Sequence, residues 1–178
     1  MRVSSDLESV DFDACYVLCI CEGNTERAII DALLDNNMLV FSRDHLVNGE
    51  VIKRTTTQNL INNYLQYDYE KELLIFRILD SKREKFSLPK AYDRYKVFNF
   101  YTINEIEMVF INYDELYDEF QKKKSKLKAS SFYKGRNKEY SKSYEYAKKY
   151  LTDLPNLCDA LKKSKRKGEL GIYDLLKL

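Results

Sequence analysis

Two apolar runs, each followed by a carboxylate, constrain the fold of this chain more than any other feature. Residues 15–21 read CYVLCIC and precede Glu22, and residues 72–79 read ELLIFRIL and precede Asp80. Neither run alternates apolar and polar side chains, as a strand with one solvated face does. Both runs therefore predict strands buried on both faces, which are typical of a parallel sheet covered by helices.

Helical periodicity separates these strands. Residues 26–37 repeat apolar side chains at helical spacing and predict a helix, and residues 55–67 predict a second helix opened by a threonine cap. Residues 95–103 predict a third strand. Strands that alternate with helices indicate an α/β fold with a mainly parallel central sheet flanked by helices.

Weaker signals suggest further elements. Residues 38–41 predict a short strand, and the turn dipeptide Asn48-Gly49 predicts a hairpin between its flanking apolar segments. The last third is expected to be helical, with one or two helices in residues 104–127 and others in residues 138–151 and 154–167.

A chain of 178 residues suits one domain, and its 44% apolar content excludes a disordered chain. We expect a loose tail over residues 1–14 and a single domain over residues 15–178, with a core to residue 112 and a helical extension beyond it. The chain has neither an apolar run long enough for a membrane helix nor a basic, apolar leader, so a cytoplasmic protein without a membrane partner is predicted. Its clustered cysteines, Cys15, Cys19 and Cys21, would share one strand face as core thiols.

Positive charge is concentrated in the last third. Between Gln121 and Tyr150 there are eleven Lys or Arg and two Glu, a net charge of +9. Such a basic face suggests a polyanion such as nucleic acid, although solvated helix faces would give the same pattern. The candidate nucleic-acid-binding residues form two runs: Lys122, Lys123, Lys124, Lys126 and Lys128, then Lys162, Lys163, Lys165, Arg166 and Lys167.

Tyrosines accompany these lysines on one predicted helix. Aromatic rings beside cations can stack bases of single-stranded nucleic acid, and they can equally fill a small core. Both interpretations remain open for Tyr140, Tyr144, Tyr146 and Tyr150.

Acidic residues follow three predicted strands. Glu22 and Asp80 each follow a buried strand, and Glu105 and Glu107 follow a third. Open α/β sheets place their sites at the carboxyl ends of strands, so we expect these acids to converge. Carboxylates together with water and phosphate are the ligands that Mg²⁺ prefers.

The first acidic segment resembles a known family. Cys21-Glu22-Gly23-Asn24-Thr25-Glu26, between a strand and a helix, is similar to the first motif of TOPRIM domains. It is closest to the E-G-x-T-E form in overcoming-lysogenization-defect-type nucleases and related bacterial defence proteins. The resemblance implies a TOPRIM-like fold with Glu22 and Glu26 as catalytic residues and Glu22 as a metal ligand. Gly23 would allow a tight turn and the close approach of a phosphate.

The other two TOPRIM motifs are only partly matched. Where the family has D-x-D, this chain has Asp80-Ser81-Lys82, so a lysine replaces the second acid. Glu84 can substitute as a metal ligand if a helix follows, and Lys82 can instead neutralise a phosphate. Residues 104–107 resemble the N-x-x-E element of the nuclease branch, which implies a catalytic Glu107 and a metal-binding Glu105.

Taken over residues 15–112, the resemblance implies Mg²⁺- or Mn²⁺-dependent phosphodiester cleavage of nucleic acid. The catalytic residues would be Glu22, Glu26, Asp80, Lys82 and Glu107, and the metal ligands Glu22, Asp80, Glu84 and Glu105. A role in phage defence or on a mobile element, with a separate ATPase or other protein partner, is implied as well.

Two alternatives stay open. The lost second Asp fits a non-catalytic TOPRIM-like module that binds nucleic acid or a partner protein. Asp80-Ser81-Lys82 also fits the (D/E)-x-K signature of restriction-endonuclease-like nucleases, with Asp68 or Glu72 as the upstream acid. The chain lacks a Walker motif and a G-x-G-x-x-G motif, and its single histidine disfavours triad chemistry.

Overall fold

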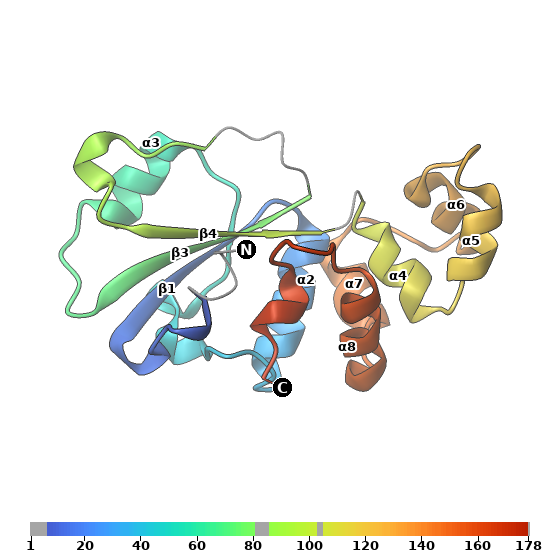
Figure 1. Ribbon diagram of the computed structural model, residues 1–178, viewed down its shortest axis with the longest axis horizontal. Helices are drawn as coiled ribbons and strands as arrows, with labels where there is room; N and C mark the ends of the chain where they lie inside the picture. Colours follow the sequence, from blue (N-terminus) through green and yellow to red (C-terminus); the bar gives the residue numbers. More distant parts are fainter. Residues whose placement is uncertain (1–6, 81–85, 103–104, 178) are drawn as a thin grey trace.

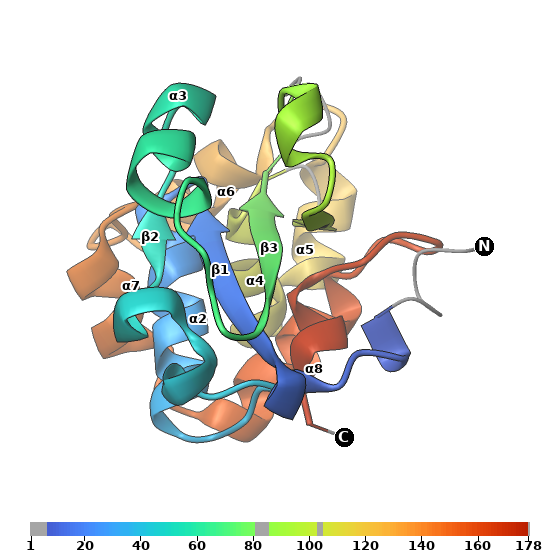
Figure 2. The ribbon, with the colours of Figure 1, turned by 90° about the vertical axis from the view of Figure 1, so that its left-hand side faces the viewer.

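The computed structural model describes residues 7–80, 86–102 and 105–177. Within them, four parallel strands form one sheet in the order β2-β1-β3-β4. Figure 2 shows β2, β1 and β3 side by side with their arrowheads pointing the same way. The strands are β1 (Cys15–Cys21), β2 (Ile52–Lys53), β3 (Glu72–Leu79) and β4 (Lys96–Tyr101). The predicted α/β class with a parallel sheet is confirmed.

Seven α-helices lie in the described part of the chain. They are α2 (Asn24–Asp35), α3 (Thr57–Leu60), α4 (Glu107–Tyr113), α5 (Tyr117–Lys123), α6 (Ala129–Arg136), α7 (Tyr144–Tyr150) and α8 (Leu154–Lys163). The helix α3 continues as a π-helical turn, and its N-cap Thr56 accepts a hydrogen bond from the backbone N–H of Asn59 at 3.2 Å. The predicted threonine cap is therefore confirmed.

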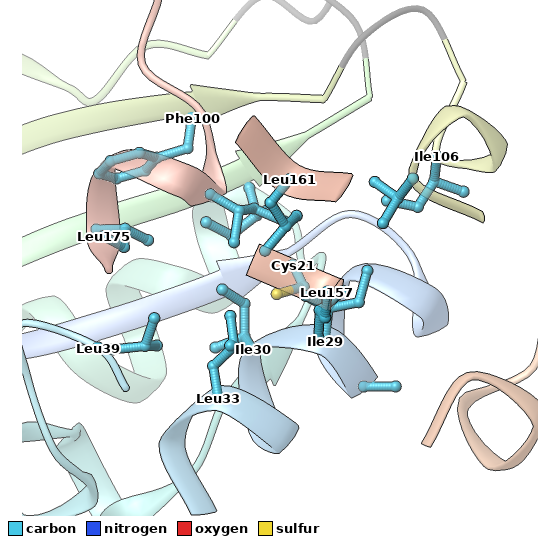
Figure 3. Packing of buried hydrophobic residues seen from close by; sticks show 14 of the residues in the cluster. Cys21, Ile29, Ile30, Leu33, Leu39, Phe100, Ile106, Leu157, Leu161 and Leu175 are labelled. Carbon is cyan, nitrogen blue, oxygen red and sulfur yellow. The ribbon is translucent and has the colours of Figure 1, made fainter. Parts of the chain in front are cut away.

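Both faces of the sheet are buried, as the apolar runs predict. On one face the cysteines Cys15, Cys19 and Cys21 lie in a core built with α2, α4 and α8. Figure 3 shows Cys21 among side chains from α2, α8, β4 and the C-terminal segment, with Ile106, just before α4, nearby. The cysteines are core thiols on one strand face, as predicted.

The opposite face has a smaller core. Leu18 and Ile20 of β1 pack there with Leu60 and Leu65 from α3 and its π-helical turn. Because successive strand residues point to opposite faces, one continuous apolar run supplies both cores.

The predicted hairpin at Asn48-Gly49 is wrong. The turn itself forms, since Asn48 and Gly49 have φ of 58° and 68°. Ile52, after the turn, pairs with Ile20 of β1 in parallel rather than with the preceding segment. Pairing with the long central strand continues the sheet, whereas a hairpin would leave an isolated ribbon.

The predicted strand at residues 38–41 is also wrong. Leu39 forms only an isolated antiparallel bridge with Leu176 near the C-terminus. Of the tail predicted over residues 1–14, the structure describes residues 7–14, where Leu7 is buried in the core and Phe12 packs against it.

Three of the C-terminal helices, α4, α5 and α6, lie beyond the carboxyl end of the sheet (Figure 1). Figure 1 shows β4 pointing toward α4, with α5 and α6 farther out. The helix α4 packs on α8, and α2 packs on α7, so the helical third contacts the helix that carries Glu26. In the described residues, no helix has the length and apolarity that crossing a membrane would require.

Candidate functional site

Glu22 and Asp80 lie side by side at the carboxyl ends of adjacent strands. The register pairs Cys21 of β1 with Ile78 of β3, which brings the residues after each strand together. The backbone N–H of Asp80 donates to Oε2 of Glu22 at 3.0 Å. Partial burial raises the pKa of Glu22, and the charge of Asp80 adds to this, while the Asp80 N–H and Arg54 oppose it. These two predicted site residues therefore meet, as the strand-end argument expected.

Glu26 is buried in the first turn of α2 and joins this pair. Its side chain is 4% exposed. Burial, with smaller contributions from the charges of Asp80 and Glu22, raises its pKa to about 7, although a hydrogen bond to its own backbone N–H and the charge of Lys142 oppose the rise. Glu26 therefore changes protonation near neutral pH.

Gly23 leaves room for the Glu26 carboxylate. A Cβ at position 23 would lie 2.2 Å from Oε2 of Glu26. The backbone of Gly23, at φ −120° and ψ 167°, is extended and open to any residue. The expected tight turn is thus not the reason for glycine here, and the space it leaves is filled by Glu26.

Glu107 is fully buried at the start of α4. Its Oε1 lies 2.8 Å from Nζ of Lys142, in the segment before α7. Apart from this ion pair, neither oxygen has a hydrogen-bond partner among the described residues. Partial burial opposes the charge of Lys142, but Glu107, Glu105 and Glu26 together raise its pKa.

Lys142 therefore joins two groups of acids. It faces Glu107 directly, and its charge acts on Glu26, which in turn lies within electrostatic reach of Glu22 and Asp80. We call this arrangement the acidic cluster, defined by Glu22, Glu26, Asp80 and Glu107.

Glu105, predicted as a metal ligand, contacts the start of α6. Its Oε2 accepts a 2.6 Å hydrogen bond from the backbone N–H of Ser130, in the first turn of α6. A carboxylate there satisfies a free N–H and complements the helix dipole.

Two basic side chains of the site, those of Arg54 and Lys142, were not identified from the sequence. Nη1 of Arg54, after β2, lies 2.8 Å from Oε1 of Glu22, and Lys142 contacts Glu107. The short β2 and the lysine-rich segment around Lys142 give no local signal of this, because both residues reach the site only through the fold. Lys82 and Glu84, predicted as catalytic and metal-binding residues, and Asn104 of the third motif lie outside the described residues.

The carboxylates suit a divalent cation that has only one or two protein ligands. Within the described ranges, no three His, Cys, Asp or Glu side chains are grouped closely enough to hold a metal ion by themselves. Mg²⁺ commonly uses only one or two carboxylates together with water and substrate phosphate. Glu22 and Asp80 supply such a pair, and the charges of both act on the nearby carboxyl of Glu26.

The basic runs are partly engaged in internal ion pairs. Lys123 pairs with Glu119, Lys165 with Asp174 and Arg166 with Glu169. The remaining predicted nucleic-acid-binding residues are exposed and make no ion pair with another described residue: Lys122, Lys124, Lys126, Lys128, Lys162, Lys163 and Lys167.

The C-terminal tyrosines pack rather than form an open stacking surface. Tyr140, Tyr146 and Tyr150 surround the ring of Phe110 with centroid distances of 5.3 to 6.1 Å. The hydroxyl of Tyr144 donates to Oδ2 of Asp31 on α2 at 3.1 Å. Of the two interpretations, core packing is the one the geometry favours.

The restriction-endonuclease-like alternative lacks its upstream acid. Glu72 begins β3 and pairs with Lys96, and Asp68 precedes it near Arg94. Asp80 lies at the other end of that eight-residue strand, about 25 Å away. Neither Asp68 nor Glu72 can share an ion with Asp80 over this distance.

The fold and the site define a class: an α/β protein with an open parallel sheet and carboxylates gathered at the carboxyl ends of adjacent strands. Comparison with protein-family models, curated proteins and solved structures finds no match for this chain.

Proposed function

We propose that this protein cleaves phosphodiester bonds of nucleic acid with Mg²⁺ or Mn²⁺ at a TOPRIM-like site. The observation that carries the proposal is the pairing of Glu22 and Asp80 at adjacent strand ends, with the buried Glu26 beside them. This is the edge of an open α/β sheet where ligands bind.

In this proposal Glu22 and Asp80 hold the cation. A bound divalent ion would supply the positive charge that offsets the developing charge on a phosphoryl group. Arg54 orients the Glu22 carboxylate through its 2.8 Å contact. Lys142 fixes Glu107 and offsets part of the charge on Glu26.

Glu26 is suited to proton transfer in this site. Its pKa of about 7 matches the neutral range in which a general acid or base works best. Gly23 leaves the Glu26 carboxylate its space at the start of α2.

A nuclease assay tests the proposal. Labelled single-stranded and duplex DNA and RNA are incubated with the protein in Mn²⁺, in Mg²⁺ and in EDTA. We expect cleavage with either metal and none in EDTA, and a loss of at least a hundredfold in rate for Glu22→Gln and Asp80→Asn. Glu72→Gln, at the amino end of β3, is the matched control and should retain the wild-type rate.

A second candidate function is a binding module without catalysis. Arg54 already pairs with Glu22, and Lys142 pairs with Glu107. These side chains neutralise part of the negative charge that a bound metal ion would otherwise neutralise. A calorimetric titration of the protein with Mn²⁺ distinguishes the two candidate functions. Binding that disappears in Asp80→Asn supports the nuclease, and no binding to the wild-type protein at millimolar Mn²⁺ supports the module.

A further inference from the structure

A groove with a basic rim lies between the helices beyond the sheet. Its cavity measures about 620 Å³, within the range of about 300–1,000 Å³ of organic-ligand sites. Residues from α4, α5, α6 and α8 line it, and Figure 1 shows α4, α5 and α6 as neighbours past the end of β4.

The rim of this groove brings the two basic runs together. Lys124 and Lys128 come from the first run and Lys163 from the second. All three are exposed, and none forms an ion pair with another described residue. Three exposed lysine ammonium groups around one hollow complement a chain of phosphates.

The groove also has apolar and aromatic lining residues. They are Met108, Phe120, Tyr117 and Leu127. Among described residues, the exposed large hydrophobic side chains are Tyr67, Tyr117 and Leu127, and two of these three line the groove at 43% and 41% exposure. Bases with free faces can stack on such side chains, whereas a duplex hides those faces inside its own stack.

The groove adjoins the acidic cluster. Glu105 lines it and lies two residues before Glu107, and the charge of Glu105 acts on Lys142. On its other side, Tyr117 and Lys163 also border a second hollow that carries Glu115 and Asp118. The carboxylates of Glu115 and Asp118 repel phosphates in that second hollow.

We propose that this groove binds a single-stranded nucleic acid and directs it to the acidic cluster. The lysines contact the phosphates, and Tyr117 stacks with a base. This inference names the substrate class of the site proposed above and, for the role of the cluster, rests on that proposed function.

The test measures binding apart from cleavage. Fluorescence anisotropy with a labelled 20-nucleotide single strand, in EDTA, compares the wild-type protein with the triple variant Lys124→Glu, Lys128→Glu and Lys163→Glu. The matched control has the same charge change on exposed lysines outside the groove: Lys90→Glu, Lys149→Glu and Lys177→Glu.

We expect the groove variant to lose at least tenfold in affinity and the control to lose less than threefold. Since each lysine–phosphate contact contributes about 0.7 to the salt slope for single strands, the slope of log K against log salt should fall by about 2 in the groove variant. Tyr117→Ala should weaken binding about fivefold or more, as removal of a stacking ring does, whereas Tyr67→Ala should not. Circular dichroism checks that each variant remains folded.

Three results would overturn the inference. Equal losses of affinity in the groove variant and the control variant would indicate a general effect of net charge. Tighter binding of a duplex of the same sequence, or displacement of the single strand by an acidic peptide at equal concentration, would assign the groove to another partner. Glu22→Gln separates the two proposals, because it should abolish cleavage and leave the affinity in EDTA unchanged.

Discussion

At the scale of single residues, the protonation of Glu26 makes the stability of the fold depend on pH. The folded-state pKa of about 7 lies above the ordinary value of 4.5. Folding therefore favours the protonated carboxyl, and this contribution is full below pH 4.5 and lost as pH rises through 7. A difference of about 2.5 pKa units corresponds to at most about 3.4 kcal/mol.

We expect Glu26→Gln to remove this dependence. Between pH 5 and pH 9, the free energy of unfolding of the wild-type protein should fall more than that of the variant, so that Glu26→Gln is relatively more stable at pH 9. Urea unfolding of both proteins at the two pH values measures the difference. Glu145→Gln, an exposed change on α7, should keep the wild-type pH dependence. Parallel pH profiles for wild-type and Glu26→Gln proteins would contradict the burial of a charge-sensitive Glu26.

The residues of the site differ in how far the sequence predicts them. Glu22, Glu26 and Asp80 are recognisable because each has a fixed position relative to a strand or helix end. Arg54 and Lys142 reach the same site from distant segments, and a lysine within a basic run carries no local mark of its partner. Glu105 was predicted as a metal ligand because it lies close to Glu107 in the sequence. Nearby polar residues at the start of a helix point in different directions, so closeness in sequence does not predict a shared site.

At the scale of elements, the capping of α6 by Glu105 is a testable assignment. Glu105→Ala removes the acceptor of the Ser130 N–H and should cost about 1 kcal/mol of stability, as lost helix caps do. Glu105→Gln keeps an oxygen acceptor and should lose less. Chemical unfolding measures both variants, and Mn²⁺ titration should give the wild-type affinity in each. A tenfold loss of Mn²⁺ affinity in Glu105→Gln would restore Glu105 as a metal ligand.

The elements that the sequence predicts best are those whose burial leaves a pattern. The strands β1 and β3 are continuous apolar runs because helices cover both of their faces. The helix α6 was not predicted, since its sequence, ASSFYKGR, has little amphipathic periodicity and its stability comes from Phe132 and Tyr133 packing in the core. The hairpin prediction was wrong because a turn dipeptide specifies the reversal of the chain but not the partner of the strand that follows.

At the scale of the whole molecule, the contact between Lys142 and Glu107 ties the helical third to the sheet edge. Glu107 begins α4, directly beyond β4, and Lys142 precedes α7, which packs on α2. Removal of one partner from a buried pair leaves an uncompensated charge and typically costs about 3–5 kcal/mol. The Lys142 side chain is 59% exposed, so water compensates part of this loss and the expected cost is nearer 2 kcal/mol.

We therefore expect Lys142→Met to destabilise the protein by about 2 kcal/mol, and Glu107→Gln in the same chain to recover most of the loss. Urea unfolding of the wild-type protein, the two single variants and the double variant gives the coupling energy between the residues.

Replacing a buried ion pair by uncharged groups is often neutral in stability, so a recovered double variant would show that the fold does not require the charges. If that variant is stable but has lost cleavage, the pair serves the acidic cluster rather than the core. A Lys142→Met protein as stable as the wild type would instead mean that Glu107 is not held as a charged partner of Lys142.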